Sequence, residues 1–308
     1  MGPIKNCYIR VSGRVLAFQT SFPDFSLFMR RILWSCLPIL LLATPAAQAG
    51  HWVLLDPKGP IARDESSLML TAFGLMLVVV IPVFVMTFLF AWKYRASNEQ
   101  APYTPDWDHS AGIEAVVWLV PTALILILSV MVWQSSHRLS PYRPLASPVP
   151  PLHVQVVAMD WKWLFIYPDL GLASINRLVV PVDTPLSFQI TSDSVMSSFF
   201  IPQWGGQIYA MGGMKTRLHL LVDQPGVYDG LNTQFSGEGF YGMTFRAEAL
   251  SRADFSRWTR EAPRGQPVLD PITFNRLEEP SEHVPPQLYS AVTPHLFDQI
   301  IRKYSGMP

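Results

Sequence analysis

The stretch Asn232–Met243, NTQFSGEGFYGM, has the outline of a metal-binding loop but none of the side chains that hold a metal tightly. Small residues alternate in it with a lone acid, aromatic residues and a methionine. Copper and zinc sites are built mainly from thiolate and imidazole ligands. The chain has 2 cysteines, Cys7 and Cys36, and neither belongs to this part of the sequence. We therefore expect the loop to bind neither copper nor zinc.

Glu114 is a second residue whose type and position could do chemistry, because it lies near the start of a long apolar stretch. An ionisable side chain inside a membrane span is costly, and it usually faces a helix bundle interior or a proton path. Two interpretations follow. Glu114 exchanges protons along such a path, or it is a carboxylate that reaches water at the membrane surface.

The aromatic stretch MDWKWLFIY contains Asp160, Trp161 and Trp163. Such a cluster serves either internal packing or contact with another protein. His219 lies in the alternating run RLHLLV, a pattern typical of a strand surface, so we do not expect it to be a metal ligand. No convincing arrangement of serine, histidine and aspartate points to a hydrolase.

The composition of the 308 residues points to a membrane protein, since 49% are hydrophobic and only 15% are charged. A typical soluble protein has about 25% charged residues. The formal net charge is zero, so the basic face that a nucleic-acid partner requires is not expected.

The N-terminus predicts a targeting segment. Met29-Arg30-Arg31 is a basic region, an apolar run follows it, and Ala47-Gln48-Ala49 is typical of a cleavage site. Met29 is an alternative start of the chain. Lipidation at Cys36 and a third membrane helix are alternatives to cleavage after Ala49.

Two later stretches predict transmembrane helices, 66–92 and 113–136, which are long enough to cross a bilayer and contain Pro82 and Pro121. A cleaved signal places the segment before the first helix outside the cell membrane, so the loop between the helices is cytoplasmic. Short runs with period-two alternation then predict about seven strands of an all-β sandwich. Ser251 with Asp254, and Thr293 with Pro294, predict the starts of two short helices that pack on the sandwich or on a partner.

The expected fold is thus a membrane α-helical hairpin followed by an all-β sandwich. The expected segments are a presequence (1–49), an outer N-terminal segment (50–65), a first span (66–92), a cytoplasmic loop (93–112), a second span (113–136), a linker (137–152), the β domain (153–250) and a helical tail (251–308).

This order of segments resembles subunit II of the haem-copper oxidases, whose outer domain is a cupredoxin-like Greek-key sandwich. The strings LLDPKGPI, FAWKYRASN, MDWKWLFIYP and QIYAMGGM are similar to the branch that oxidises ubiquinol, of cytochrome bo type. The resemblance covers most of the mature chain.

In the cytochrome c-accepting branch, the outer domain binds two copper ions through cysteines, histidines, a methionine and a carbonyl. The resemblance aligns SDSVMSSFFIP and QFSGEGFYGM with the two pieces of that site. Ser197 then stands in place of a histidine, Phe235 and Gly239 stand in place of the cysteines, and Met243 remains. A degenerate site of this kind implies that the chain carries no metal or other cofactor.

The resemblance implies a non-catalytic subunit of a proton-pumping respiratory enzyme, which oxidises ubiquinol and reduces oxygen to water. Haems and copper are expected in a large subunit I, with a subunit III and a small subunit IV as further partners. The chain would stabilise and cap subunit I in the bacterial inner membrane, in contact with lipid, with its β domain and mature termini in the periplasm.

For individual residues, the resemblance implies that Glu114 lies at the entrance of a proton path. It also implies that Asp160, Trp161 and Trp163 lie in a region that could contact the large subunit. Two alternatives stay open. One is a copper-bearing cytochrome c oxidase subunit II, and the other is a stand-alone membrane-anchored binding module.

Overall fold

The computed structural model describes residues 7–11, 14–18, 53–102 and 104–306. The chain forms two units, Met1–Trp52 and Val53–Pro308. In the first, strands β1 (Cys7–Val11) and β2 (Arg14–Phe18) pair in antiparallel fashion. The expected basic region, Cys36 and the cleavage site after Ala49 lie outside the described residues, so the presequence stays a prediction.

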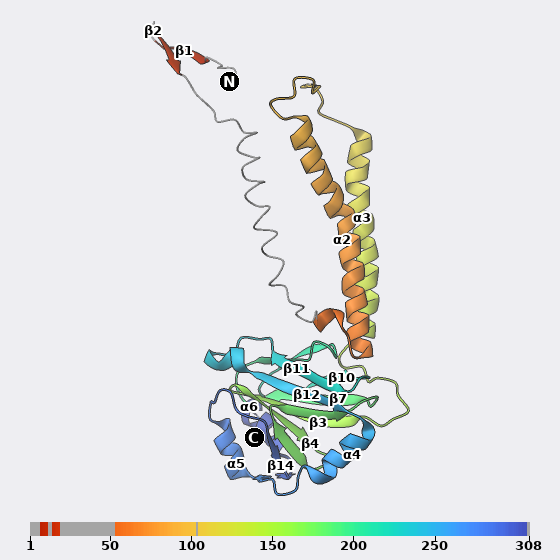
Figure 1. The fold of residues 1–308 in the computed structure, drawn as a ribbon, viewed down its shortest axis with the longest axis vertical. Coiled ribbons are helices and arrows are strands. Elements are labelled where there is room, and N and C mark those ends of the chain that lie inside the picture. Colours follow the sequence, from red (N-terminus) through yellow and green to blue (C-terminus); the bar gives the residue numbers. More distant parts are fainter. Residues whose placement is uncertain (1–6, 12–13, 19–52, 103, 307–308) are drawn as a thin grey trace. The chain divides into compact units, whose positions relative to one another are not determined.

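The second unit begins with a short 3-10 turn, η1 (Val53–Leu55), and a helical hairpin of α2 (Pro60–Lys93) and α3 (Ala111–Arg138) (Figure 1). Both predicted spans lie inside these helices, and each helix continues through its proline. Both are long and apolar enough to cross a membrane. Their apolar side chains are exposed all round, as in Phe73 (62%) and Trp118 (74%), so the hairpin requires lipid or protein around it.

Two sheets form the sandwich that follows the hairpin. The first, six-stranded sheet has the order β10 (Thr216–Leu220), β7 (Leu186–Ser192), β3 (Leu152–Met159), β4 (Lys162–Tyr167), β5 (Leu172–Ile175) and β14 (Gln287–Tyr289). The second, five-stranded sheet has the order β6 (Arg177–Pro181), β12 (Thr244–Leu250), β11 (Gly226–Asn232), β8 (Ser197–Phe200) and β9 (Gln207–Ala210).

Parallel pairing of β3 with β7 and of β12 with β6 interrupts the antiparallel order, inside the first sheet and at one edge of the second. The hairpin and this cupredoxin-like sandwich confirm the expected fold class. Strands β5, β9 and β11 were not predicted. The first two have only four residues each, and β11, GVYDGLN, contains two glycines and an aspartate, which are uncommon in strands.

The core has two layers, and β4 contributes to both. Trp163, Phe165 and Tyr167 point into the cluster between the sheets. Leu164 and Ile166 point the other way, into a second cluster under the C-terminal tail. Because both faces of β4 are covered, its sequence KWLFIY is an almost unbroken apolar run instead of an alternating one.

The tail supplies the cover for that second face. It consists of α4 (Arg252–Glu261), α5 (Pro271–Glu278), α6 (Leu296–Ser305) and the paired strands β13 (Val268–Leu269) and β15 (Ala291–Val292). Phe274, Phe297 and Ile300 from α5 and α6 are buried against the six-stranded sheet. Of the two alternatives for the tail, packing on the sandwich is therefore confirmed.

Ser251 caps α4 as predicted, since its hydroxyl accepts a hydrogen bond from the backbone N–H of Asp254 at 3.1 Å. The predicted start of α6 at Thr293 and Pro294 is wrong. This helix begins after His295, which has a left-handed backbone (φ 60°), while the Thr293 hydroxyl donates to the carbonyl of Leu269 at 3.1 Å. The missed helix α5 is capped by Asp270.

Candidate functional site

The two pieces of the metal-loop outline meet in the second sheet. Ser197 begins β8, and Asn232 ends β11 opposite Phe199 of β8. The chain then passes through the 3-10 turn η2 (Glu238–Gly242) and returns to Met243, whose carbonyl accepts from the Asn232 N–H at 3.1 Å. Ser197 and Met243 are both buried, at 2% and 1% exposure. The register of β8 and β11 thus brings together two residues that are far apart in the sequence.

Asn232 fills the space between them with its side-chain amide. Its Nδ2 group lies 3.2 Å from the Met243 Sδ, 3.1 Å from the Ser236 Oγ and 3.4 Å from the Ser197 Oγ. Its Oδ1 accepts from the backbone N–H groups of Ser198 at 2.8 Å and Gln234 at 3.0 Å. The amide therefore uses its donors and its acceptor within the protein.

Sequence reasoning passed over Asn232, although it opens the quoted stretch. The available signal was an asparagine where β-branched or aromatic residues are usual, at the end of a strand, followed by a turn-rich segment. Two of its partners, Ser197 and Ser198, lie on another strand, so its role as the centre of the site depends on the fold.

The indole of Trp161 covers the loop from the other side. Its Nε1–H donates to the carbonyl of Ser236 at 2.8 Å. A Cβ atom on Gly239 would lie 2.5 Å from the indole ring, so the loop and the ring fit together only because this residue is glycine. Gly239 is buried, whereas Phe235 is 72% exposed and its ring lies 5.6 Å from that of Phe240.

The copper pair of the cupredoxin-like oxidase domains does not fit these residues. At the aligned positions stand a hydroxyl, a phenyl ring and a glycine, and the methionine sulfur already accepts from the Asn232 amide. Within the ranges that the structure describes, no group of three or more histidine, cysteine, aspartate or glutamate side chains could hold a metal ion. The arrangement is a packed, hydrogen-bonded cluster, which we call the seal, of Ser197, Asn232, Ser236 and Met243 beneath the Trp161 ring.

The aromatic stretch divides between surface and core. Asp160 is half-buried and accepts a hydrogen bond from the Ser194 hydroxyl. Trp163 is fully buried, with its ring centroid 5.5 Å from Phe199 and 5.7 Å from Phe245. Contact of Trp163 with another subunit is therefore wrong, because its side chain has no outer surface. For Asp160 and Trp161 such a contact stays a prediction.

Lys162 was overlooked in the sequence, yet it ties this stretch to the tail. Its side chain is buried, and its Nζ donates to the carbonyls of Asp160 (2.8 Å) and Glu279 (2.9 Å) and to the Ser281 Oγ (2.7 Å). Burial lowers the pKa of Lys162, and the nearby charge of Asp160 partly offsets this effect. Three acceptors within hydrogen-bond distance allow the ammonium group to stay inside the fold.

Glu114 lies apart from all of these residues, in the first turn of α3. The opposite end of α3 is the one that leads into the sandwich. The Glu114 Oε1 lies 2.6 Å from the Nδ1 of His109, and both side chains are more than half exposed. The Glu114 carboxylate and the His109 imidazole thus lie side by side where the second long apolar helix begins.

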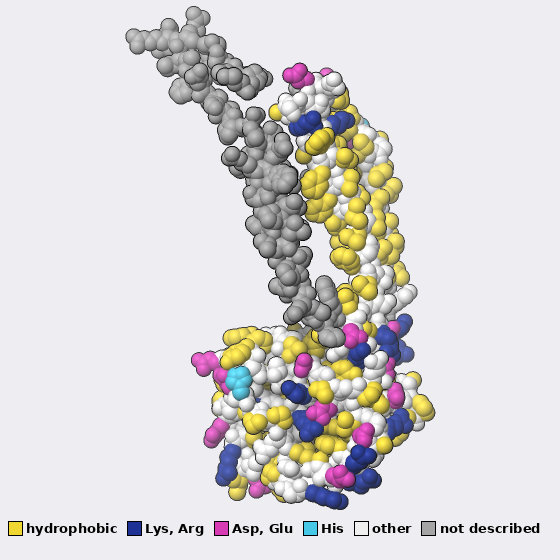
Figure 2. Space-filling view, viewed as in Figure 1, with side chains coloured by type: hydrophobic (Ala, Val, Ile, Leu, Met, Phe, Trp, Pro, Cys, Tyr) yellow, Lys and Arg dark blue, Asp and Glu magenta, His cyan; other side chains and the backbone are white. Residues whose placement is uncertain are grey.

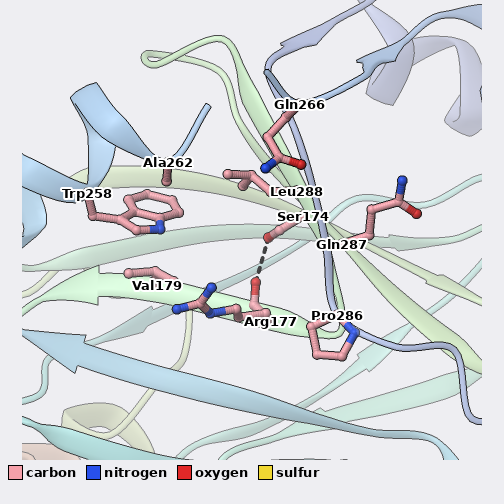
Figure 3. A pocket seen from close by; sticks show the side chains of 9 residues that line it. All are labelled: Ser174, Arg177, Val179, Trp258, Ala262, Gln266, Pro286, Gln287 and Leu288. Atoms are coloured by element: carbon pink, nitrogen blue, oxygen red, sulfur yellow. Dashed lines mark hydrogen bonds between the residues drawn. The ribbon is translucent and has the colours of Figure 1, made fainter. Parts of the chain in front are cut away.

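A separate hollow of about 380 Å³ lies between the tail and the sandwich (Figure 3). Ser174 donates to the carbonyl of Arg177 at 2.5 Å, and both oxygens of Glu248 bind the Arg177 guanidinium at 2.9 and 2.7 Å. The Trp258 Nε1 is covered and has no hydrogen-bond partner among the residues that the structure describes. Because the Arg177 charge is paired with Glu248 and the Trp258 indole N–H is covered, we assign no chemistry to this hollow.

Comparisons with known proteins match two family models. One, "Cytochrome C oxidase subunit II, periplasmic domain", matches residues 169–249, and the other, "COX Aromatic Rich Motif", matches residues 265–307. Among solved structures, the periplasmic domain of cytochrome oxidase subunit II (CoxB) of Bradyrhizobium japonicum is 22% identical. That likeness covers 38% of this chain and 96% of the other, with a TM-score of 0.36.

Curated relatives match along most of the chain. Cytochrome bo(3) ubiquinol oxidase subunit 2 of Pseudomonas putida is 52% identical, over 83% of this chain and 82% of its own length. The protein of the same name from Pseudomonas aeruginosa is 55% identical, over 82% and 76%. Ubiquinol oxidase subunit 2 of Acetobacter aceti is 48% identical, over 82% and 83%.

Proposed function

Because the chain belongs to the family of ubiquinol oxidase subunit 2, we propose that it is the second subunit of a respiratory complex that oxidises ubiquinol and reduces oxygen to water. The complex is an oxidoreductase, and this chain is one of its subunits. The hairpin anchors the chain in the membrane, and the sandwich forms the outer part of the complex.

The single observation that supports the electron route in this proposal is the hydrogen-bonded seal around Asn232. A copper centre that accepts electrons from a soluble cytochrome needs soft ligands, and here the aligned positions offer none. The amide, the serine hydroxyls and the Met243 sulfur bind one another instead. Electrons then enter elsewhere, from ubiquinol bound by the large subunit, which also holds the haems and the copper at which oxygen is reduced.

This chain has a structural role in the proposal. It stabilises and caps the large subunit I, alongside a subunit III and a small subunit IV. The chain lies in the bacterial inner membrane, with its sandwich in the periplasm. This orientation places Glu114 on the cytoplasmic side, where a surface carboxylate beside His109 can collect protons for a path into the large subunit.

The proposal is tested by gentle purification of the affinity-tagged chain in detergent. We expect haem-bearing subunits to co-purify with it, and the preparation to consume oxygen with ubiquinol but far more slowly with reduced cytochrome c. The sandwich should contain no stoichiometric copper. Purification of the chain without any haem-bearing partner would favour a stand-alone membrane-anchored module. Copper in the sandwich together with fast cytochrome c oxidation would favour a cytochrome c oxidase subunit II.

A further inference from the structure

A hollow of about 580 Å³ opens where the hairpin joins the sandwich. Its walls are the first turns of α2, the end of α3 with the linker that follows, and the edge of the sandwich near Gly206 and His219. Charged side chains of both signs gather where the helices meet the sandwich (Figure 2). The four charged residues that line the hollow are Asp64, Glu65, Arg138 and Arg143.

The depth of this hollow in a membrane follows from helix length. Helix α3 has 28 residues, so it spans about 42 Å at 1.5 Å per residue. A bilayer with its headgroups is about 40–45 Å thick, and its hydrocarbon core is about 30 Å. Arg138, the last residue of α3, and Glu65, which directly precedes the uncharged stretch of α2, then lie in the outer headgroup layer. Phospholipid headgroups therefore surround the hollow.

Part of the charge in the hollow is already paired, and part is available. The guanidinium of Arg138 binds the Asp64 Oδ2 at 2.6 Å. In contrast, the Arg143 side chain is exposed and makes no polar contact with any residue that the structure describes. Both oxygens of Glu65 share the backbone N–H of Gly206, at 3.1 and 3.2 Å, which leaves each with capacity for another donor.

The hollow also has an apolar side. Ile61, Leu139, Leu145 and Leu218 line it together with the charged residues. The His219 Nδ1 lies 3.0 Å from the carbonyl of Pro141, so the histidine holds the linker against the sandwich. A ligand that fits here needs an anion for Arg143, a hydrogen-bonding cation for Glu65 and an apolar part that reaches toward the membrane.

We propose that this hollow binds one phospholipid with a phosphoethanolamine headgroup. The phosphate contacts Arg143 and the outer side of the Arg138–Asp64 pair, and the ammonium donates to Glu65. Two positive and two negative side chains sum to no net charge, which suits a zwitterion better than an anionic lipid. The bound lipid fastens the joint between hairpin and sandwich. This inference depends on insertion of the hairpin in the membrane and not on the oxidation of ubiquinol.

The test uses the full chain in its purified complex, with p-benzoylphenylalanine in place of Leu145 as a photo-crosslinker. The complex is stripped of lipid and placed in micelles that contain dioleoyl phosphatidylethanolamine. We expect crosslinking of this lipid to residue 145. Arg143→Gln should reduce the crosslink about tenfold, the effect of losing one charge-assisted hydrogen bond of about 1.4 kcal/mol or more. Arg264→Gln, which removes the same charge from an exposed site outside the hollow, should leave it unchanged.

Further experiments distinguish recognition of the phosphoethanolamine headgroup from binding of phosphate alone or of another subunit. Glu65→Leu should abolish the preference for phosphatidylethanolamine over phosphatidylcholine, because leucine has no acceptor for the ethanolamine N–H and choline has no N–H to donate. Inorganic phosphate at the same concentration should fail to compete, because it lacks the ammonium and the acyl chains. Equal competition by phosphate, an equal crosslink in Arg143→Gln, or a crosslink to another subunit's polypeptide in place of lipid would each overturn the proposal. These readouts do not involve oxygen consumption, so they stand apart from the test of electron transfer.

Discussion

The indole ring of Trp161 lies so close to Gly239 that a single added carbon on the glycine would fall 2.5 Å from it. The resemblance to copper-bearing relatives aligns this glycine with a cysteine ligand. The glycine that stands in place of the ligand is therefore also the residue that allows the indole to pack closely on the loop. A side chain at position 239 requires the ring or the loop to move.

We expect Gly239→Ala to destabilise the sandwich by about 1–3 kcal/mol, the usual cost of overpacking a filled site. In a Trp161→Ala background the same change should cost less than half as much, because the ring that it strikes is gone. Thermal unfolding of the detergent-solubilised chain, followed by near-ultraviolet circular dichroism, measures both values. Equal losses in the two backgrounds would show that the ring does not constrain the glycine.

Asn232→Ala should destabilise the chain by about 2–4 kcal/mol, because it leaves the N–H groups of Ser198 and Gln234 without their acceptor. The buried Ser236 hydroxyl and the Met243 sulfur also lose their shared donor. Asn275→Ala, at an exposed position on α5, is the matched control and should change the melting temperature little. If both variants melt alike, Asn232 is not the centre of the seal.

Glu114→Ala should slow ubiquinol-driven oxygen uptake by the purified complex several-fold while the haem content stays normal. Loss of the carboxylate beside His109 removes the proposed proton collector, and Glu114→Asp should restore most of the rate. Glu99→Ala, which removes an exposed acid from the loop before α3, serves as the control. Unchanged turnover in Glu114→Ala would assign this residue to the membrane surface alone.

Lys303→Met should make stability depend on pH through Asp193. The Asp193 side chain is 2% exposed, and its Oδ1 lies 3.0 Å from the Lys303 Nζ. Burial raises the pKa of Asp193, and the hydrogen bond and charge of Lys303 oppose that rise. Without the lysine the pKa rises further. A carboxyl with a raised folded-state pKa destabilises the fold as pH increases above its unfolded value, about 3.9.

The melting temperature of the variant should therefore be close to that of the wild type near pH 4 and lower than that of the wild type near pH 7. The loss at pH 7 should be about 1–2 kcal/mol, less than for a fully buried pair, because Lys303 is 45% exposed to screening water. Lys215→Met removes an exposed lysine and should show no such dependence on pH. A pH-independent loss in Lys303→Met would mean that the residue contributes packing and not charge.

The sequence predicted the parts of the fold that depend on local patterns. Long uncharged apolar runs identify α2 and α3, and period-two alternation identifies strands such as β7, LSFQITS. Patterns failed where an element is short or its environment unusual. Strand β11 was missed because its glycines and aspartate have low strand propensity, and pairing with β12 and β8 stabilises it nonetheless. For Trp163 the sequence left internal packing and subunit contact open, because its burial depends on β4 lying between two covered faces.

For the candidate site, the sequence alone determined that thiolate and imidazole ligands do not stand at the aligned positions, since ligand type is a property of each residue. Only the tertiary structure decided what replaces it. The Asn232 amide meets Ser197 and Met243 because β8, β11 and η2 converge, and the Trp161 ring reaches Gly239 from the other sheet. Contacts between residues far apart in the chain depend on strand register and sheet packing. No local pattern in the sequence carries that information.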